Sequence, residues 1–171
     1  MAVLHPPGLS GADWLERPAT QAVLAALETR GFAARVVGGA VRNALLGLPV
    51  TDVDIATTAR PDEAIAVAEA AGLKSVPTGI AHGTVTVVSG GKAFEVTTLR
   101  QDAETHGRHA TVVFTDDWAA DARRRDFTLN ALYCSAEGEV FDPLGGYADL
   151  AARRVRFIGE AAERAGDDGD V

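Results

Sequence analysis

The sequence predicts an α/β or α+β fold, with a mixed sheet flanked by helices. Segments with the apolar alternation of strands are interleaved with segments of helical periodicity, and a Gly90-Gly91 turn joins two strands as a hairpin. Such interleaving is typical of one sheet covered by helices. At 171 residues, the chain has the length of one domain with a sizeable core.

The first half of the chain is expected to supply three helices and two strands. Residues 1–18, rich in proline and glycine, are expected to form an irregular lead-in. The following elements are a helix at 20–30 stopped by Gly31, a strand at 34–37, a helix from Gly38 to Leu46, a strand at 50–57, and a helix opened by Pro61 and ended by Gly72.

The second half begins with the hairpin and ends in short elements. The expected order is a hairpin of 84–88 and 93–99, a mobile polar loop at 100–110 with His106 and His109, a helix started at 115–117, a helix at 127–132, and strands at 133–136 and 139–141. We expect His82 to lie in a turn, and Trp14 and Trp118 to serve packing.

Composition favours a globular protein outside membranes. Hydrophobic residues make up 47% of the chain, yet no apolar run approaches the roughly 20 residues that a membrane span needs. The start lacks the basic and apolar regions of a signal peptide. The single cysteine, Cys134, allows no internal disulfide and no cysteine-based zinc site. We therefore expect a cytoplasmic protein.

The charge distribution limits the kind of nucleic-acid contact. The formal net charge is −8, which argues against a broad grip on a polyanion by this chain alone, because neutralising phosphates requires clustered Lys and Arg. Basic residues cluster at 123–125 and 153–156. An acidic chain with small basic islands suits a site that holds one nucleotide triphosphate on metal ions.

Asp52-Val53-Asp54 is the strongest local signal for chemistry. Alternate residues of a strand face the same way, about 6 to 7 Å apart, so both carboxylates are expected on one face. Such a pair can bracket two Mg²⁺ ions roughly 3.5 to 4 Å apart, and Mg²⁺ prefers oxygen ligands. A bare pair of this kind is more often part of a solvated edge strand, so its sequence context decides.

Upstream of this pair, Gly38 and Gly39 lead from a strand into a helix. Amides at a helix start bind anions, and glycine lets the backbone come close to a phosphate. Arg42, about one turn into the helix, adds a charged donor. A Gly-Gly turn alone is a weak signal, but a phosphate-binding helix start shortly before a metal-binding pair predicts a triphosphate site.

Glu95 is the candidate third carboxylate. It lies between Phe94 and Val96 and is expected on the opposite face of its strand from them. If that strand neighbours the Asp52–Asp54 strand, Glu95 can bind metal or take the proton from an attacking hydroxyl. A surface glutamate is the equally weighted alternative.

A polar run at 124–130 is the other candidate for binding a nucleotide. Arginine beside aspartate at a helix start can hold a ribose and a phosphate, and Asp126 and Asn130 are expected one turn apart on one helix face. The alternative is that Asp126 caps the helix while Arg124 and Arg125 are solvated.

Taken in order, these motifs resemble a known family. VGGAVRNALLG at 37–47, followed by DVDIAT at 52–57, resembles the first signature of class II tRNA nucleotidyltransferases and bacterial poly(A) polymerases. EVTTLR at 95–100 is similar to their next strand, and RRDFTLNA at 124–131 to their second signature. The resemblance covers residues 20–164.

This resemblance implies a polymerase-β-like palm in which Asp52 and Asp54 hold two Mg²⁺ ions. The implied reaction is attack by a tRNA 3′ hydroxyl on the α-phosphate of CTP or ATP, with release of pyrophosphate. Residues 100–115 match the family's flexible loop, whose movement is tied to the switch from C to A addition. The implied triphosphate contacts are Gly39 and Arg42, and the implied ribose contacts are Arg125, Asp126 and Asn130.

The sequence also departs from the family. Asn43 stands where the family often has Asp, which we expect to be tolerated. The Glu-Asp-x-x-Arg motif of the family's neck, which selects the base, does not occur in the 171 residues. The expected organisation is therefore a lead-in (1–18), a head domain (19–158) and the start of a neck or a truncated acidic tail (159–171), without the body and tail that bind tRNA. A poly(A) polymerase head and a catalytically silent remnant that acts as a binding module stay open as alternatives.

Overall fold

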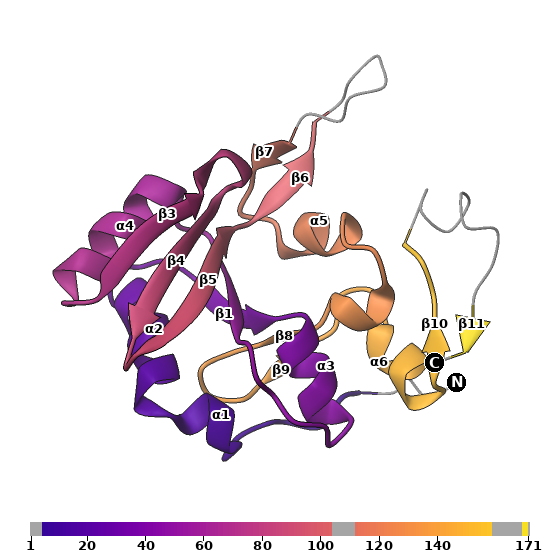
Figure 1. The fold of residues 1–171 in the computed structure, drawn as a ribbon. Helices are drawn as coiled ribbons and strands as arrows, with labels where there is room; N and C mark the ends of the chain where they lie inside the picture. The colour runs from indigo at the N-terminus through magenta and orange to yellow at the C-terminus, as the bar shows by residue number, and fades with distance from the viewer. Residues whose placement is uncertain (1–4, 104–111, 159–168, 171) are drawn as a thin grey trace.

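The computed structural model describes residues 5–103, 112–158 and 169–170 (Figure 1). The strands are β1 (Ala34–Val37), β2 (Asp54–Thr57), β3 (Lys74–Gly79), β4 (Thr84–Ser89), β5 (Lys92–Thr98), β6 (Arg100–Asp102), β7 (Val112–Phe114), β8 (Tyr133–Cys134), β9 (Val140–Phe141), β10 (Arg154–Val155) and β11 (Gly169–Asp170). The helices are α1 (Asp13–Glu16), α2 (Pro18–Thr29), α3 (Gly39–Leu45), α4 (Pro61–Ala70), α5 (Trp118–Arg123) and α6 (Gly146–Ala151), with 3₁₀ turns η1 (Ile80–His82) and η2 (Thr128–Asn130).

Seven strands form one mixed sheet in the order β3-β4-β5-β2-β1-β8-β9. The β2–β5 pair is parallel, and the other neighbouring pairs are antiparallel. The β6–β7 ribbon follows β5 in the chain and extends away from the seven-stranded sheet (Figure 1). The flanked mixed sheet confirms the predicted fold class.

The alternation of strand side chains divides the core between the two faces of the sheet. Val36, Ile55 and Val96 are at most 1% exposed and belong to the large cluster that also contains the buried faces of α2 and α4. Val37 and Ala56 point to the opposite face, where a smaller cluster includes residues of α5 and β8. The part of this second face that the smaller cluster leaves uncovered is available to line a site.

Several elements follow the sequence prediction closely. Pro61 is the first residue of α4, and Gly72, with φ 77°, follows the end of this helix. The hairpin of β4 and β5 turns at Gly90-Gly91 as expected. Among the described residues, no helix is long and apolar enough to cross a membrane.

Other elements differ from the prediction. The helix α1 lies inside the stretch expected to be irregular, because Trp14 and Leu15 are buried in the large core cluster. The strand β3 was absent from the sequence prediction. The strand expected at 50–57 starts at Asp54, so the residues before it are not paired in the sheet. The segment expected to be a loop at 100–110 starts with strand β6, while His106 and His109 lie outside the described residues.

The prediction of a helix at 127–132 is wrong. The structure has only the 3₁₀ turn η2 there. The Leu132 carbonyl accepts the Gly38 N–H at 3.1 Å, and Tyr133 then pairs with Val37 in the sheet. This tertiary pairing overrides the local helical preference.

Candidate active site

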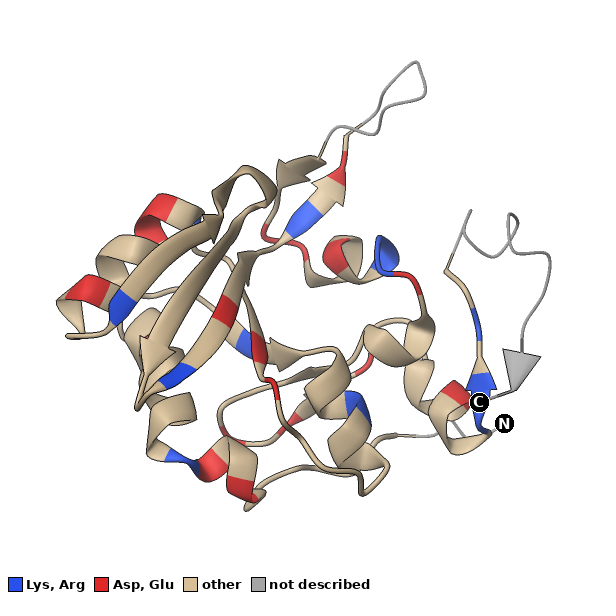
Figure 2. Ribbon diagram, in the orientation of Figure 1, with Lys and Arg blue, Asp and Glu red and all other residues tan. Residues whose placement is uncertain are grey.

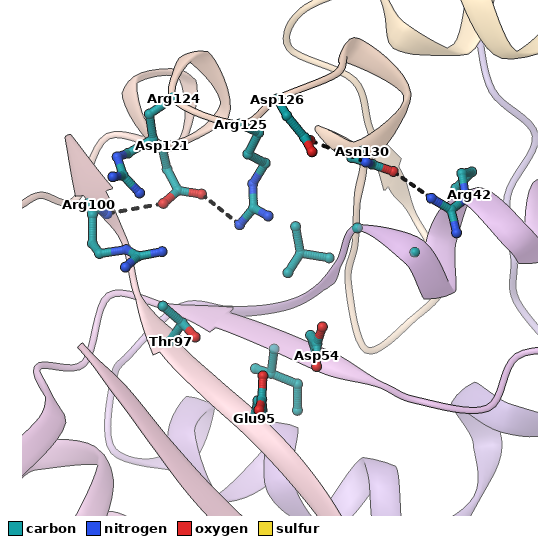
Figure 3. A pocket seen from close by; sticks show the side chains of 14 residues that line it. Arg42, Asp54, Glu95, Thr97, Arg100, Asp121, Arg124, Arg125, Asp126 and Asn130 are labelled. Carbon is teal, nitrogen blue, oxygen red and sulfur yellow. Dashed lines mark hydrogen bonds and ion pairs between the residues drawn. The ribbon is translucent and has the colours of Figure 1, made fainter. Parts of the chain in front are cut away.

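An open pocket of about 360 Å³ lies on the face of the sheet away from α2 and α4 (Figure 3). A volume of this order is within the range of small-molecule sites, about 300 to 1,000 Å³. It brings together every predicted site residue except Asp52. These residues are Gly38, Gly39, Arg42, Asp54, Glu95, Arg124, Arg125, Asp126 and Asn130.

Two carboxylates form the floor of the pocket. Asp54 begins β2 and is the register partner of Glu95 on the parallel strand β5, so the two side chains lie next to each other (Figure 3). Although Asp54 is exposed to the pocket, partial burial of its carboxylate raises its pKa, and the negative charges of Glu95 and Asp52 raise that pKa further. The strand of Glu95 therefore neighbours the strand that begins at Asp54, which is the condition that the sequence left open for a role of Glu95 in the site.

Asp52 lies at the edge of this arrangement. It precedes β2 and lines a neighbouring hollow of about 220 Å³ together with Arg17 and Lys92. Its charge still acts on Asp54. Of the two carboxylates expected on this strand, only Asp54 lies on it. The role of Asp52 as a metal ligand stays a prediction.

The floor has the donors that Mg²⁺ prefers, but not a preformed cage. Throughout the described ranges, no three His, Cys, Asp or Glu side chains converge closely enough to hold a metal ion by themselves. Mg²⁺ usually binds through one or two carboxylates and completes its shell with water and substrate phosphate. Burial, and after it the negative charges of Glu95 and Asp52, raise the pKa of Asp54, and a bound divalent cation would offset both effects. The donor set therefore fits Mg²⁺.

The start of α3 forms one side of the pocket. Gly38 has φ 80° and ψ −129°, a conformation that side chains rarely adopt, and it turns the chain from β1 into the helix. A Cβ on Gly39 would lie 3.4 Å from Arg42 Nη2, so the guanidinium group lies over the helix start. Helix amides and a cation therefore meet where a phosphate group would bind.

A chain of hydrogen bonds links this side to the second motif (Figure 3). Arg42 Nη1 donates to Asn130 Oδ1 at 2.8 Å, and Asn130 Nδ2 donates to Asp126 Oδ1 at 3.3 Å. Arg42 Nε also donates to Asn43 Oδ1 at 3.1 Å, while the Asn43 amide donates to the Pro49 carbonyl. Two neutral amides thus hold Arg42, which leaves its charge for a ligand.

We expect Asn130→Ala to weaken triphosphate binding about 5-fold, the equivalent of one hydrogen bond to Arg42. The loss should be smaller for CMP, which lacks the β- and γ-phosphates that Arg42 is expected to contact. Titration calorimetry of both ligands measures the difference. Gln21→Ala removes another partly buried amide away from the pocket and should leave both affinities unchanged. Equal losses for CMP and the triphosphate would point to the ribose contact of Asn130 alone and contradict a role through Arg42.

Arginines form the wall opposite the acidic floor. Figure 2 shows basic positions on β6 and α5, each beside an acidic position on the same element, and acidic positions on β2 and β5. Arg124 pairs with Asp102 at 3.3 Å, and Arg125 pairs with Asp121 at 3.1 Å. Burial lowers the pKa of Arg100, and the charge of Arg124 lowers it further. This concentration of positive charge suits an anionic ligand lying between wall and floor.

Three polar pocket residues were missed by the sequence prediction: Thr97, Arg100 and Asp121. Thr97 follows Glu95 by two positions on β5 and shares its face, a strand spacing that could have identified it. Asp121 precedes Arg125 by four positions, the spacing of facing helical side chains. Arg100 ends the EVTTLR run at 95–100, but it was also expected to begin a loop and was given no role in the site.

Other candidate functional groups serve packing. Trp118 packs edge-on against Tyr133, with ring centroids 5.2 Å apart, and Trp14 is 8% exposed. Burial raises the pKa of the Cys134 thiol to about 12, which disfavours the reactive thiolate form. His82 ends the η1 turn, as expected.

The fold and this pocket can now be compared with known proteins. Residues 34–156 match the family model described as the poly(A) polymerase head domain. The chain is 46% identical over 138 residues to the mitochondrial CCA tRNA nucleotidyltransferase 1 of Danio rerio, covering 80% of this chain and 32% of that protein. It is 44% identical over 148 residues to the CCA-adding enzyme of Geobacillus thermodenitrificans, covering 85% and 36%.

A solved structure agrees. The crystal structure of the Bacillus stearothermophilus CCA-adding enzyme in complex with CTP superposes with a TM-score of 0.76 at 40% identity, over 86% of this chain and 35% of that one. These relatives are named as nucleotidyltransferases and CCA-adding enzymes. The chain itself belongs to the poly(A) polymerase head-domain family, because the family model covers more than half of it. It spans about a third of the length of the relatives it matches.

Proposed function

We propose that this chain is the catalytic head of an RNA nucleotidyltransferase that adds CMP and AMP, from CTP and ATP, to the 3′ hydroxyl of tRNA. The observation that carries the proposal is the acidic floor facing a basic wall across one pocket, with a glycine-led helix start between them. Relatives named as CCA-adding enzymes support the choice of RNA substrate.

The proposed chemistry is attack by the RNA 3′ hydroxyl on the α-phosphate, with pyrophosphate as the leaving group. The residues of this chain act mainly by positioning and charge neutralisation, the dominant contributions in phosphoryl transfer. Arg42 and the Gly39 amide hold the triphosphate, while Arg125, Asp126 and Asn130 hold the ribose, with Arg124 beside them. Glu95, next to Asp54, either accepts the hydroxyl proton or shares in metal binding.

Asp54 and, by family resemblance, Asp52 are the proposed ligands of two Mg²⁺ ions. Such ions, when bound, neutralise charge on the attacking and leaving oxygens. A carboxyl group must lose its proton before it can bind a cation. Because the pKa of Asp54 is raised, acidification should protonate this group, and weaken nucleotide binding, at a higher pH than for an ordinary aspartate.

The direct test is titration calorimetry of CTP and of ATP into the chain in the presence of Mg²⁺. Both nucleotides should bind, with affinities within about 3-fold of each other, less than 1 kcal/mol. We expect this weak discrimination because the proposed contacts of the pocket go to the triphosphate and the ribose, which CTP and ATP share. Addition of EDTA should abolish binding, and absence of binding with Mg²⁺ would refute a self-sufficient nucleotide site.

Poly(A) polymerase activity is the second candidate, since the matching family model carries that description. The two activities differ in their products on a tRNA that ends before its CCA sequence. Addition of up to three nucleotides from CTP and ATP indicates a CCA-adding enzyme, whereas a long A tract from ATP alone indicates a poly(A) polymerase.

A further inference from the structure

Asp121 is a buried carboxylate in the pocket wall that the proposed chemistry does not use. It lies on α5 and is 3% exposed. A charged group with so little contact with water is stable only when hydrogen-bond donors surround it. The donors around Asp121 therefore indicate its role.

Three donors from three segments converge on this carboxylate. Its Oδ1 accepts the Arg100 backbone N–H at 3.0 Å, at the start of β6. Its Oδ2 accepts Arg125 Nη2 at 3.1 Å and the Tyr133 hydroxyl, from β8, at 2.7 Å. Figure 3 shows Asp121 between Arg100 and Arg125, with a dashed line to each.

Arg125 is the partner that faces the ligand space. Its Nε donates to the Tyr133 hydroxyl at 3.4 Å, so carboxylate and phenol hold the guanidinium group from two sides. The Arg125 side chain is 26% exposed against 4% for Asp121, so the guanidinium group keeps access to the pocket. Burial would lower the pKa of Arg125, but Tyr133 and Asp121 more than compensate and raise it.

The position of Asp121 excludes it from the chemistry itself. Both of its oxygens accept hydrogen bonds, and it lies across the pocket from Asp54 and Glu95 (Figure 3). The neighbouring ion pair of Arg124 with Asp102 is expected to hold its arginine less firmly, because the Asp102 side chain is 55% exposed and water competes for it.

We propose that Asp121 is a positioning residue: it fixes the Arg125 guanidinium group in the orientation in which Arg125 contacts the incoming nucleotide, and it does not touch the nucleotide. This inference rests on the proposed function. Its consequence is that Asp121 contributes to nucleotide affinity only while Arg125 is present.

The test is a double-mutant cycle read by titration calorimetry with CTP and Mg²⁺. Asp121→Asn keeps the shape of the side chain but removes its charge, and we expect it to weaken CTP binding about 10-fold, the lower range for residues that orient a binding group. Tyr133→Phe should weaken binding less, because Asp121 still holds Arg125. In the Arg125→Ala background, Asp121→Asn should have no further effect on affinity.

Asp117→Ala is the matched control for a purely structural effect. Asp117 caps the same helix by accepting the Ala119 and Ala120 N–H groups, so its loss destabilises α5 without touching Arg125. It should lower the melting temperature while CTP affinity stays within 2-fold of wild type, about 0.4 kcal/mol.

Four outcomes would count against the proposal. Wild-type affinity in Asp121→Asn, or additive effects of Asp121→Asn and Arg125→Ala, overturns the positioning role while the proposed function stands. Equal losses of affinity in Asp117→Ala and Asp121→Asn reduce the role of Asp121 to helix stability. Absence of CTP binding in wild type refutes the proposed function, and the positioning role with it.

Discussion

Asp54→Asn is expected to abolish Mg²⁺-dependent triphosphate binding and, at the same time, to stabilise the metal-free chain. The loss of affinity should exceed about 100-fold, since even residues that only orient metal ligands contribute about 10- to 100-fold. Titration calorimetry with CTP and Mg²⁺ measures the loss, and thermal unfolding in EDTA measures the gain.

The expected gain in stability follows from the pKa of Asp54, which is raised in the folded chain. The folded state then binds the Asp54 proton more tightly than the unfolded state, so the free energy of unfolding falls as the pH rises through the folded pKa. Asparagine carries no charge and avoids this loss. Because Asp54 faces the open pocket, the gain at neutral pH should be at most about 1 kcal/mol.

Two further variants give this experiment its controls. Asp62→Asn removes one negative charge from α4, on the other side of the sheet, and should change neither affinity nor its pH dependence. Asp52→Asn tests whether the carboxylate outside the pocket contributes as the family resemblance implies. Wild-type affinity in Asp54→Asn would remove Asp54 from the metal site. A stability gain that persists unchanged at about pH 3, where the carboxyl group is protonated, would contradict the electrostatic cause.

The sequence was sufficient to predict the sheet-and-helix class and most of the pocket, because those signals are local. The glycine pair before α3 and the alternation around Glu95 each depend on neighbouring residues in the chain. Whether Glu95 meets Asp54 depends on the parallel pairing of β2 with β5, strands separated by a helix and a hairpin. Sequence alone left that question open for this reason.

The predictions that failed also depended on pairing between segments that are distant in the sequence. Local periodicity predicted a helix at 127–132, but the pairing of Tyr133 with Val37 allows only the η2 turn. Asn130 nevertheless reaches Asp126, so the expected proximity survives without the expected helix. The position of Asp52 could not be foreseen either, because the start of a strand depends on its partners.

Gly146→Ala is the substitution from which we expect the largest loss of stability. A Cβ at this position, in the first turn of α6, would overlap the Thr128 carbonyl of η2. A backbone carbonyl cannot rotate away as a flexible side chain can. Overpacking of this kind costs roughly 3 kcal/mol, at the upper end of the usual range. For a chain of this length, that is about 6 to 12 °C in Tm, measurable by calorimetry.

The same substitution should also weaken nucleotide binding, because α6 and η2 cannot separate freely. Asp142 accepts the Gly146 and Tyr147 N–H groups, and the Thr128 hydroxyl donates to the buried Asp149. Relief of the clash must therefore move η2, which carries Asn130, the hydrogen-bond partner of Arg42.

Gly8→Ala is the matched control. Its Cβ would lie 3.6 Å from the Gly138 carbonyl oxygen, an ordinary contact, so stability should change by less than about 0.5 kcal/mol. A wild-type melting temperature for Gly146→Ala would contradict the close packing of α6 on η2. A lowered melting temperature with wild-type affinity for CTP would mean that η2 does not transmit the displacement to the pocket.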